Sequence, residues 1–497
     1  MSIPGIQPGF NADNSSKSTD NVDSNVISTE TEQTIMDSTE NITGNIYSDD
    51  VELTNEEDPQ YLNLSIGMQW SLHLGKQDLV GQNVKLYITV LSGICEILGT
   101  ELANDVEYCF QDWNFGVLAI EDSRIKWRVA NLMIPLNDPF LTTITPNATA
   151  RYIYNLHFAI EKLRYSSFMG PKMLILGDHN TGKTSLARTL SSYSIKNIAY
   201  QPMFINLDPG QPIVSPPGCL MATPISDLID LQSPFWNESL TSGATKLHSR
   251  QPLLKCFGLE NIEENIEWYK ESATQLLDSV VQRLINDSLV QRSGCIIDTP
   301  SCFYEEYDKF KDILKAIINK LDVDVIVILT NNNEDLSLDN ESINELIDTT
   351  KCTPIKLPTL SGVIPNDDAY KRLLQRLALR DYFYGDSTTV LSPYVTSCDF
   401  TDLIIWRFPA TLDQEQAPTP LFLLPVTVDQ SSLQHAIVAI SYSPKRANPE
   451  EIVKSSIMGF ALITEVNEKR QKCKLLLPVP GTLPKNALVL TSYRYLE

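Results

Sequence analysis

Apolar and polar residues alternate along residues 62–74, where every even-numbered position is apolar. A period of two is typical of strands that bury one face. The same alternation returns over residues 86–90, and two shorter strand-like stretches follow with turns between them. Short strands joined by turns predict a small β-sandwich domain over residues 59–147.

The pattern becomes helical after Pro146, beginning with apolar groups at helical spacing over residues 152–164. Further along, short continuous apolar runs alternate with helical segments. Buried strands that alternate with helices predict a parallel sheet covered on both faces, so we expect an α/β domain over residues 148–385. The apolar runs are 172–176, 203–207, 295–297 and 323–329, and the helical segments are 183–194, 261–286 and 305–320.

The last part of the chain, residues 386–497, mixes strand patterns with prolines. We expect a small C-terminal α+β domain there. A chain of 497 residues is long enough for about three domains of ordinary size. The predicted fold is therefore α/β, with a central domain flanked by a sandwich and a smaller C-terminal domain.

Charge is spread unevenly along the chain. The formal net charge is −23, and residues 1–58 contain thirteen acidic residues and one basic residue, Lys17. This stretch is rich in Ser, Thr, Asn and Asp and poor in aromatics, which predicts a disordered acidic tail. The remainder is also acidic, so we do not expect a dominant surface for duplex DNA.

Membrane, secretory and zinc-binding classes find no support in the sequence. No apolar run approaches the ~18 residues of a membrane helix, and no basic segment followed by an apolar stretch opens the chain. The nine cysteines are scattered and none forms a Cys-x-x-Cys pair. We therefore expect a protein of a reducing compartment without a zinc site.

The strongest chemical signal lies at residues 177–184, Gly-Asp-His-Asn-Thr-Gly-Lys-Thr. This sequence matches the P-loop pattern, and it follows a predicted buried strand and opens a predicted helix. Glycines let backbone N–H groups surround a phosphate, and the helix presents its positive end to the anion. Lys183 would bind the β- and γ-phosphates and Thr184 would bind magnesium. The motif predicts a site for ATP with Mg²⁺.

A magnesium site of this kind also needs an acidic residue, and two candidates follow buried strands. Asp208 ends the run over 203–207, and Asp298 ends the run over 295–297. Ligands bind beyond the carboxyl ends of parallel strands, so both acids could reach the site. We favour Asp208 as the magnesium ligand, because Gln211 follows it on the same turn and could orient water or substrate.

Several long stretches resemble the Clp family of polynucleotide 5′-hydroxyl-kinase-like proteins. Within it, the chain is most similar to the fungal ATP-binding subunits of cleavage factor IA, which act in pre-mRNA cleavage and polyadenylation. The resemblance covers nearly everything from about residue 60 to the end and leaves out the acidic tail. The similar stretches are 96–102, 152–158, 181–190, 205–212, 217–219, 222–227, 240–245, 459–470 and 491–497.

The resemblance implies which residues hold the nucleotide. Family members hold adenine between the sandwich and the P-loop domain, and the matching positions here are Gln69 and Asn114. Relatives have an acidic residue at the first position and often a lysine at the second, so both positions depart from the family pattern. An amide can still bond the edge of adenine. The matching phosphate-binding residues are Asn180, Thr181, Gly182, Lys183, Thr184 and Ser185.

The family divides into kinases and ATP-holding proteins. Active relatives place an arginine-rich lid over the transferred phosphate, and the segment matched to it here, residues 282–292, has only Arg283 and Arg292. Asp208 and Gln211 keep the catalytic option open, with Lys183 as the phosphate cation. If the chain is a kinase, these five residues would be catalytic.

The resemblance favours a nuclear ATP-bound scaffold of cleavage factor IA, without kinase turnover. It would bridge other subunits, notably a Pcf-type subunit that binds the polymerase tail, and would meet pre-mRNA indirectly. Two alternatives stay open. One is an active RNA 5′-hydroxyl kinase. The other is a conformational NTPase like the GPN-loop enzymes, which also contain the sequence Asn-Leu-Asp-Pro that this chain has at residues 206–209.

Overall fold

The computed structural model describes residues 58–75, 84–131, 142–198, 200–236, 252–330, 341–386, 390–410 and 421–496. The predicted acidic tail therefore lies outside the described residues except for Asp58, and so does the family-like stretch 240–245. No helix in the described part of the chain is long and apolar enough to cross a bilayer.

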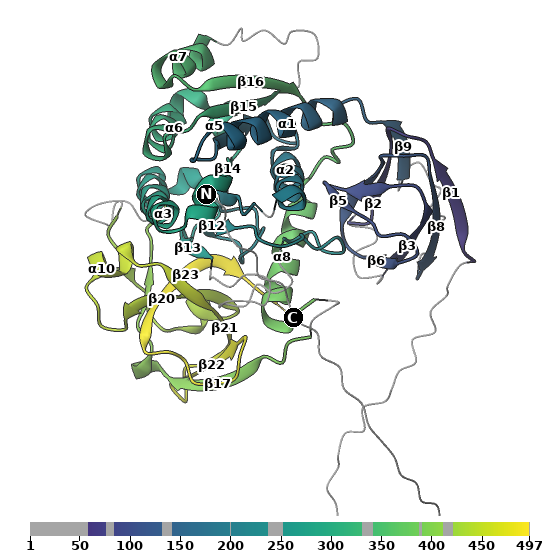
Figure 1. Ribbon diagram of the computed structural model, residues 1–497. Coiled ribbons are helices and arrows are strands. Elements are labelled where there is room, and N and C mark those ends of the chain that lie inside the picture. The colour runs from purple at the N-terminus through teal and green to yellow at the C-terminus, as the bar shows by residue number, and fades with distance from the viewer. Residues whose placement is uncertain are drawn as a thin grey trace, which may run out of the picture. The chain divides into compact units, whose positions relative to one another are not determined.

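The N-terminal part is the predicted β-sandwich (Figure 1). One antiparallel sheet has the strand order β1-β8-β3-β6, and the other has the order β5-β4-β7-β2-β9. Alternate residues such as Leu72, Ile88 and Val117 fill the space between the sheets. The strands are β1 (Gln60–Leu64), β2 (Met68–His73), β3 (Lys85–Ser92), β4 (Cys95–Ile97), β5 (Thr100–Glu101), β6 (Glu107–Phe110), β7 (Asn114–Ala119), β8 (Ser123–Ala130) and β9 (Thr142–Pro146).

Strand β2 differs from the predicted half-buried strand, because both of its faces are buried. Trp70 and Leu72 point into the sandwich, as the alternation predicted. The polar residues on the opposite face, Gln69 and Ser71, are only 8% and 3% exposed. Gln69 Nε2 lies 3.5 Å from the carbonyl oxygen of Gly362, so the P-loop domain covers this face.

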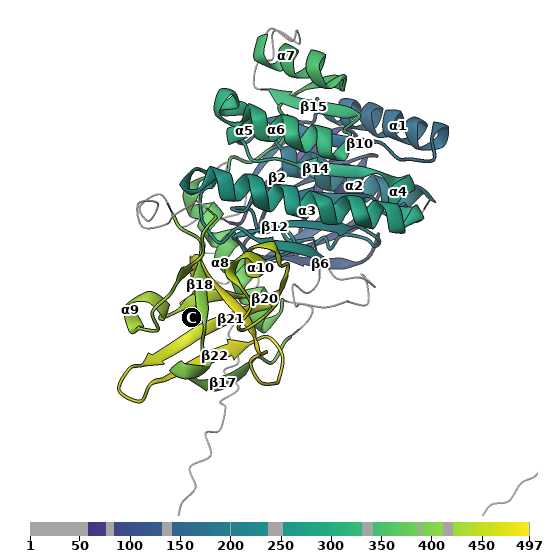
Figure 2. The same ribbon diagram turned by 90° about the vertical axis from the view of Figure 1, so that its left-hand side faces the viewer.

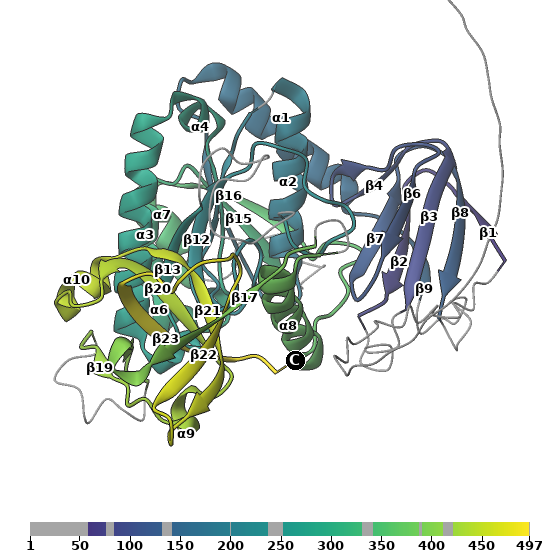
Figure 3. The same ribbon diagram turned by 90° about the horizontal axis from the view of Figure 1, so that it is seen from below.

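The central domain is built on one seven-stranded sheet with the order β13-β12-β11-β14-β10-β15-β16. Its strands are β10 (Lys172–Gly177), β11 (Met203–Asn206), β12 (Cys219–Pro224), β13 (Leu253–Cys256), β14 (Cys295–Asp298), β15 (Val325–Thr330) and β16 (Thr353–Pro358). Helices α1 (Ala150–Ser166) and α2 (Lys183–Ile198) cover one face of the sheet, and α3 (Ile266–Asn286), α6 (Tyr307–Leu321) and α7 (Glu341–Thr350) cover the other (Figures 1 and 3).

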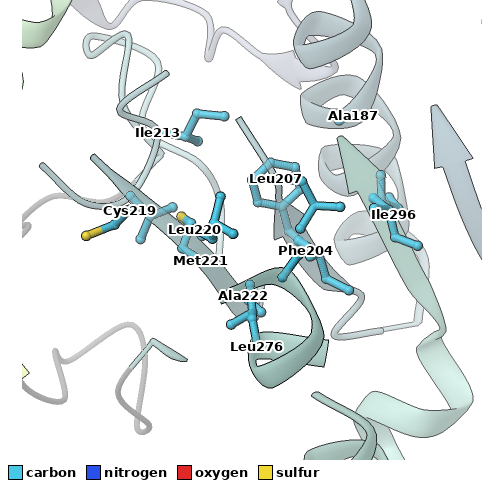
Figure 4. Packing of buried hydrophobic residues seen from close by; sticks show 14 of the residues in the cluster. Ala187, Phe204, Leu207, Ile213, Cys219, Leu220, Met221, Ala222, Leu276 and Ile296 are labelled. Carbon is cyan, nitrogen blue, oxygen red and sulfur yellow. The ribbon is translucent and has the colours of Figure 1, made fainter. Parts of the chain in front are cut away.

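The core of this domain shows why its strands read as continuous apolar runs. Phe204 on β11 and Ile296 on β14 are buried, with Ala187 from α2 and Leu276 from α3 in the same cluster (Figure 4). A strand covered by helices on both faces needs apolar side chains at odd and even positions alike. The predicted α/β layer is confirmed.

The sheet is not parallel throughout. Strands β11, β14, β10, β15 and β16 are parallel, but β12 and β13 are antiparallel to their neighbours. A parallel connection needs a crossover, usually a helix. The twelve residues between β11 and β12 contain four prolines, which cannot sit inside a helix. The chain therefore turns back and adds β12 in the opposite direction.

Two predicted helices are subdivided. The segment 261–286 begins with a 3₁₀ turn, η1 (Ile262–Glu264), before α3, where the Asn265 side chain accepts a hydrogen bond from the Trp268 N–H. The segment 305–320 is preceded by a short helix, α5 (Cys302–Glu305), before α6. A further short helix, α4 (Ser288–Ser293), leads into β14.

Helix α8 (Asp368–Tyr384) follows the central sheet, and the C-terminal domain comes after it (Figure 2). Its sheet has the order β17-β22-β21-β20-β23-β18-β19. The strands are β17 (Tyr394–Asp399), β18 (Ile405–Arg407), β19 (Leu424–Pro425), β20 (Ala436–Pro444), β21 (Ile457–Asn467), β22 (Lys472–Leu477) and β23 (Asn486–Arg494), with η2 (Phe400–Asp402), α9 (Gln430–Leu433) and α10 (Pro449–Lys454). This matches the predicted α+β domain.

Candidate nucleotide-binding site

The P-loop connects the end of β10 at Gly177 to the start of α2 at Lys183. Asn180 and Gly182 have φ angles of 58° and 93°, in the left-handed region. Asparagine tolerates this region, and glycine enters it without strain. A Cβ atom on Gly182 would lie 2.8 Å from Cγ2 of Val363, so glycine is also required by space.

Lys183 is held at the loop by backbone oxygens. Its Nζ donates to the carbonyl oxygens of Gly177 at 2.9 Å and Asp178 at 2.7 Å. Burial lowers the pKa of Lys183, and the charges of Asp298 and Asp208 oppose that shift. The ammonium group is therefore close to the loop's backbone and can exchange these neutral oxygens for a phosphate.

The Thr184 hydroxyl is the point where three elements meet. Its Oγ1 lies 2.8 Å from Oε1 of Gln211, on the turn after β11, and 2.5 Å from Oδ2 of Asp298, at the end of β14. The sequence paired Thr184 with Asp208 for magnesium, and the structure places Asp298 directly beside this hydroxyl.

Asp298 has the properties of a cation ligand. It is 1% exposed, and its Oδ1 has no hydrogen-bond partner among the described residues. Burial raises the pKa of Asp298 to about 6, with hydrogen bonding to Thr184 and the charge of Lys183 opposing the rise. An unsatisfied buried carboxylate oxygen requires an explanation. A hard divalent cation, which prefers oxygen ligands, fits this position beside a hydroxyl.

Asp208 lies nearby, and its hydrogen bonds stabilise the turn that follows β11. Its Oδ1 accepts a hydrogen bond from the Gly210 N–H at 2.9 Å, and its own N–H donates to Oδ1 of Asn206 at 2.9 Å. The side chain also borders the cavity described next. Asp208 therefore remains a predicted ligand, with Asp298 as a second acid in contact with Thr184.

A cavity of about 340 Å³ extends from the P-loop to the sandwich. Its size falls within the range of small-molecule sites. Thr181 is fully buried beneath the loop, and its Oγ1 donates to the carbonyl oxygen of Asp178. The predicted residues that line the cavity are Gln69, Asn114, Asn180, Gly182, Lys183, Thr184, Ser185, Asp208 and Gln211.

Gln69 lies at the side of the cavity formed by the sandwich. Its Oε1 accepts a hydrogen bond from Nδ2 of Asn147 at 2.6 Å. Its Nε2 is so close to Gly362 that a Cβ atom there would lie 2.0 Å away. The amide that the resemblance assigned to adenine therefore also joins the sandwich to the P-loop domain.

Asn114 is also tied to residues outside its own strand. Its backbone N–H donates to the Tyr370 hydroxyl at 3.0 Å, and its Oδ1 accepts from the N–H of Gly75 at 2.8 Å. Contact of either predicted amide with adenine stays a prediction.

The segment 360–371, between β16 and the first turn of α8, contributes residues that sequence reasoning missed. Its Asn366 N–H donates to Oδ1 of Asn180 at 3.0 Å. Tyr370 and Lys371 line the cavity, and Lys371 Nζ lies 3.0 Å from the position of a Cβ on Gly210. The segment carries no nucleotide motif, so only its position in space shows its role.

Arg283 and Arg292, the arginines matched to a kinase lid, lie away from the P-loop. Both precede β14, which runs parallel to β10 with Cys295 opposite Lys172 and Asp298 opposite Ile175. Because the chain enters β14 at the amino edge of the sheet, both arginines lie at that edge, whereas the P-loop is at the carboxyl edge. Neither lines the cavity.

The arginine that does border the cavity, Arg188 on α2, is engaged with the protein. Its guanidinium donates to the carbonyl oxygens of Ser233 at 3.3 Å and Pro234 at 3.2 Å, and it lies 5.1 Å from the centre of the Trp113 ring. Burial lowers the pKa of Arg188 to about 10. Arg188 is therefore fixed between the sandwich and the P-loop domain.

Comparison with known families matches most of the described chain. The model described as mRNA cleavage and polyadenylation factor CLP1 P-loop matches residues 177–385. The N-terminal beta-sandwich domain of polyadenylation factor matches residues 78–167, and Pre-mRNA cleavage complex II protein Clp1 matches residues 391–497. These matches confirm the predicted family and identify a nucleotide-binding type of central domain.

Individual relatives match over nearly their whole length. The mRNA cleavage and polyadenylation factor CLP1 of Candida glabrata is 48% identical, over 87% of this chain and 93% of the relative. A solved complex of wild-type Clp1p with part of Pcf11p is 47% identical with a TM-score of 0.81, and covers 88% of this chain and 99% of that chain.

A second solved structure, with the same identity, TM-score and coverage, is described as showing an extended interface between Pcf11p and Clp1p and the structural basis for ATP loss in a glycine-to-arginine mutant. The identity and coverage of these relatives are too high for a shared fold alone. The chain belongs to the CLP1 family of mRNA cleavage and polyadenylation factors.

Proposed function

We propose that this protein is an ATP-binding scaffold subunit of the nuclear pre-mRNA 3′-end cleavage and polyadenylation machinery, cleavage factor IA. The observation that carries the nucleotide assignment is the cavity that joins a complete P-loop to the face of the sandwich. A ligand enclosed by two domains holds them together, which is what a structural nucleotide does. The ATP loss described for a solved relative supports the choice of adenine.

Magnesium would bind with the nucleotide at Thr184. Asp298 Oδ2 is in contact with the Thr184 hydroxyl and its Oδ1 is unpartnered, so this carboxylate is suited to the ion directly or through water. Asp208, which lines the cavity, is the second candidate acid for the ion. The ion would neutralise charge on the β- and γ-phosphates, and Lys183 would bind the same groups.

The cations at the cavity support a function without kinase turnover. Phosphoryl transfer requires positioned cations around the developing charge. Among the described residues, the lysines and arginines that line the cavity are Lys183, Arg188 and Lys371. Arg188 is bound to backbone carbonyls, which leaves one lysine from the P-loop and one from α8. This is fewer than the arginine cluster of an active lid.

The proposed partners come from the relatives. Solved relatives with 47% identity are complexes with Pcf11p. We extend this to a Pcf-type subunit that binds the polymerase tail, with the chain bridging other subunits of cleavage factor IA and meeting pre-mRNA indirectly. The nuclear location follows from the process in which such a factor works.

Mass spectrometry of the nucleotide released from purified protein tests the assignment. ATP with magnesium should copurify, because enclosure between two domains slows release. Recovery of GTP, or an empty site in protein prepared with magnesium, would contradict the adenine assignment.

A transfer assay with 5′-hydroxyl RNA and labelled ATP tests the kinase alternative, with an active relative as control. We expect no transfer above background. Transfer near the control rate that is lost in Asp208→Ala would establish a kinase instead. Capture of a Pcf-type fragment by the same preparation tests the scaffold role.

A further inference from the structure

Helix α8 carries two buried tyrosines that make the same kind of bond at opposite ends. The Tyr370 hydroxyl accepts a hydrogen bond from the backbone N–H of Asn114 on β7 at 3.0 Å. The Tyr382 hydroxyl accepts one from the backbone N–H of Phe460 on β21 at 2.9 Å. The two side chains therefore tie α8 to the sandwich and to the C-terminal sheet, and Tyr370 is the one that lines the nucleotide cavity.

The Tyr370 ring fits closely against the sandwich. A Cβ atom on Gly75 would lie 2.2 Å from Cε2 of Tyr370, so the ring occupies the space that glycine leaves. The Gly75 N–H in turn bonds the Asn114 side chain. Burial raises the pKa of Tyr370, so the phenol is neutral and keeps a proton to donate.

The segment 360–371 contacts the phosphate side as well. The Leu360 N–H donates to the carbonyl oxygen of Thr181 at 3.2 Å, and the Asn366 N–H bonds the Asn180 side chain. Lys371, directly after Tyr370, lies beside the Asp208–Gly210 turn. One continuous segment thus touches the P-loop, the acidic turn and the base-side strand of the sandwich.

We propose that Tyr370 is a positioning residue that holds β7 against the segment covering the P-loop and thereby sets how long ATP stays bound. The inference rests on the proposed ATP site. A nucleotide enclosed by the sandwich and the P-loop domain leaves when these separate, so each bond between them slows release. The bond from Asn114 N–H to Tyr370 lies at the cavity wall, since both residues line the cavity.

The test measures dissociation of labelled ATP from the full-length protein with magnesium, chased with unlabelled ATP. Tyr370→Phe removes the hydroxyl oxygen and keeps the ring. Dissociation should become about tenfold faster, the effect of losing one well-made buried hydrogen bond. Tyr382→Phe is the matched control, because it loses the same type of bond on the same helix. It should lower the melting temperature and leave the dissociation rate within about twofold of wild type.

Unchanged dissociation in Tyr370→Phe would overturn the proposal, and so would equal acceleration in both variants, since that would reflect general loosening of α8. If Tyr370→Phe does not fold, Gly75→Ala disturbs the same contact from the sandwich side and should also speed release. Wild-type protein that holds no ATP would overturn the proposed nucleotide function itself, and this inference with it.

Discussion

The two ends of the nucleotide cavity are built in different ways. At the phosphate end, Lys183 and Thr181 bond carbonyl oxygens only three to six residues away in the chain. At the end formed by the sandwich, which we call the base end because adenine is predicted to bind there, Gln69 lies against Gly362 and Asn114 bonds Tyr370, each across more than 250 positions. The phosphate-binding loop follows from a local backbone motif, whereas the base end exists only when two domains pack together. Changes at the two ends should therefore have different consequences.

The largest effect should come from the phosphate end. Lys183→Ala with Thr184→Ala removes the cation and the metal-binding hydroxyl, each of which bonds a charged group. ATP affinity should fall by at least about 100-fold. Calorimetric titration measures the affinity. The melting temperature of protein purified with nucleotide should also fall, because a ligand bound only by the native state stabilises it. Unchanged melting after loss of ATP would argue against a structural nucleotide.

The two acids at the phosphate end can be separated by paired substitutions. Asp298→Asn should weaken magnesium-dependent ATP binding about tenfold, because this carboxylate contacts Thr184 and has an unpartnered oxygen. Asp208→Asn should have the smaller effect, since its Oδ1 already accepts the Gly210 N–H. ATP titrations with and without magnesium measure both. A larger loss of affinity in Asp208→Asn would instead identify Asp208, the acid that the sequence favoured, as the magnesium ligand.

A substitution at the base end should cost less and should depend on the base. Gln69→Ala removes one neutral amide, so ATP affinity should drop about fivefold. If the amide bonds adenine, the ratio of ATP affinity to GTP affinity should also become smaller. The paired titrations with ATP and GTP measure this. An equal loss for both nucleotides would show that Gln69 acts through its contact with Gly362 and does not read the base.

The smallest effect concerns the pH dependence of the nucleotide-free protein. Burial raises the pKa of Asp298 from an ordinary value of 3.8 to about 6. The folded state then binds more protons than the unfolded state between these values, so Asp298 lowers stability as pH rises through this window. Asp298→Asn lacks this charge. The melting temperature of the variant minus that of wild type should therefore be more positive at pH 7.5 than at pH 4.5. The same difference at both pH values would contradict a buried, ionising Asp298.

The phosphate end of the cavity was easier to predict from the sequence than the base end. The P-loop, its flanking strand and helix, and the acids at the ends of β11 and β14 were all found, because each is marked by a pattern a few residues long. The sequence favoured Asp208 over Asp298 because Gln211 follows it, but neither sequence context shows which acid lies beside Thr184, and the structure places Asp298 there. The contact with Thr184 depends on which strands lie next to β10 in the sheet, and β14, which ends at Asp298, is one of its two neighbours.

The assignment of Arg283 and Arg292 to a lid shows that matching a sequence segment to a family's lid does not establish where its side chains lie. Arginines in a helix before a strand can lie at either edge of a sheet, depending on the direction of that strand. Here the parallel pairing of β14 with β10 places them at the amino edge, while α8 brings Lys371 to the cavity. No periodicity in the chain marks this difference.

The sequence by itself determined the domain types, the phosphate-binding loop and the family, because local backbone geometry and long matching stretches encode them. Tertiary structure alone decided that β2 is buried on its polar face, that Asp298 meets Thr184, and that Tyr370 and Gln69 join the two domains. The physical reason is that these contacts link residues far apart in the chain. Their energy comes from burial and hydrogen bonding that arise only after the sheets and helices have packed.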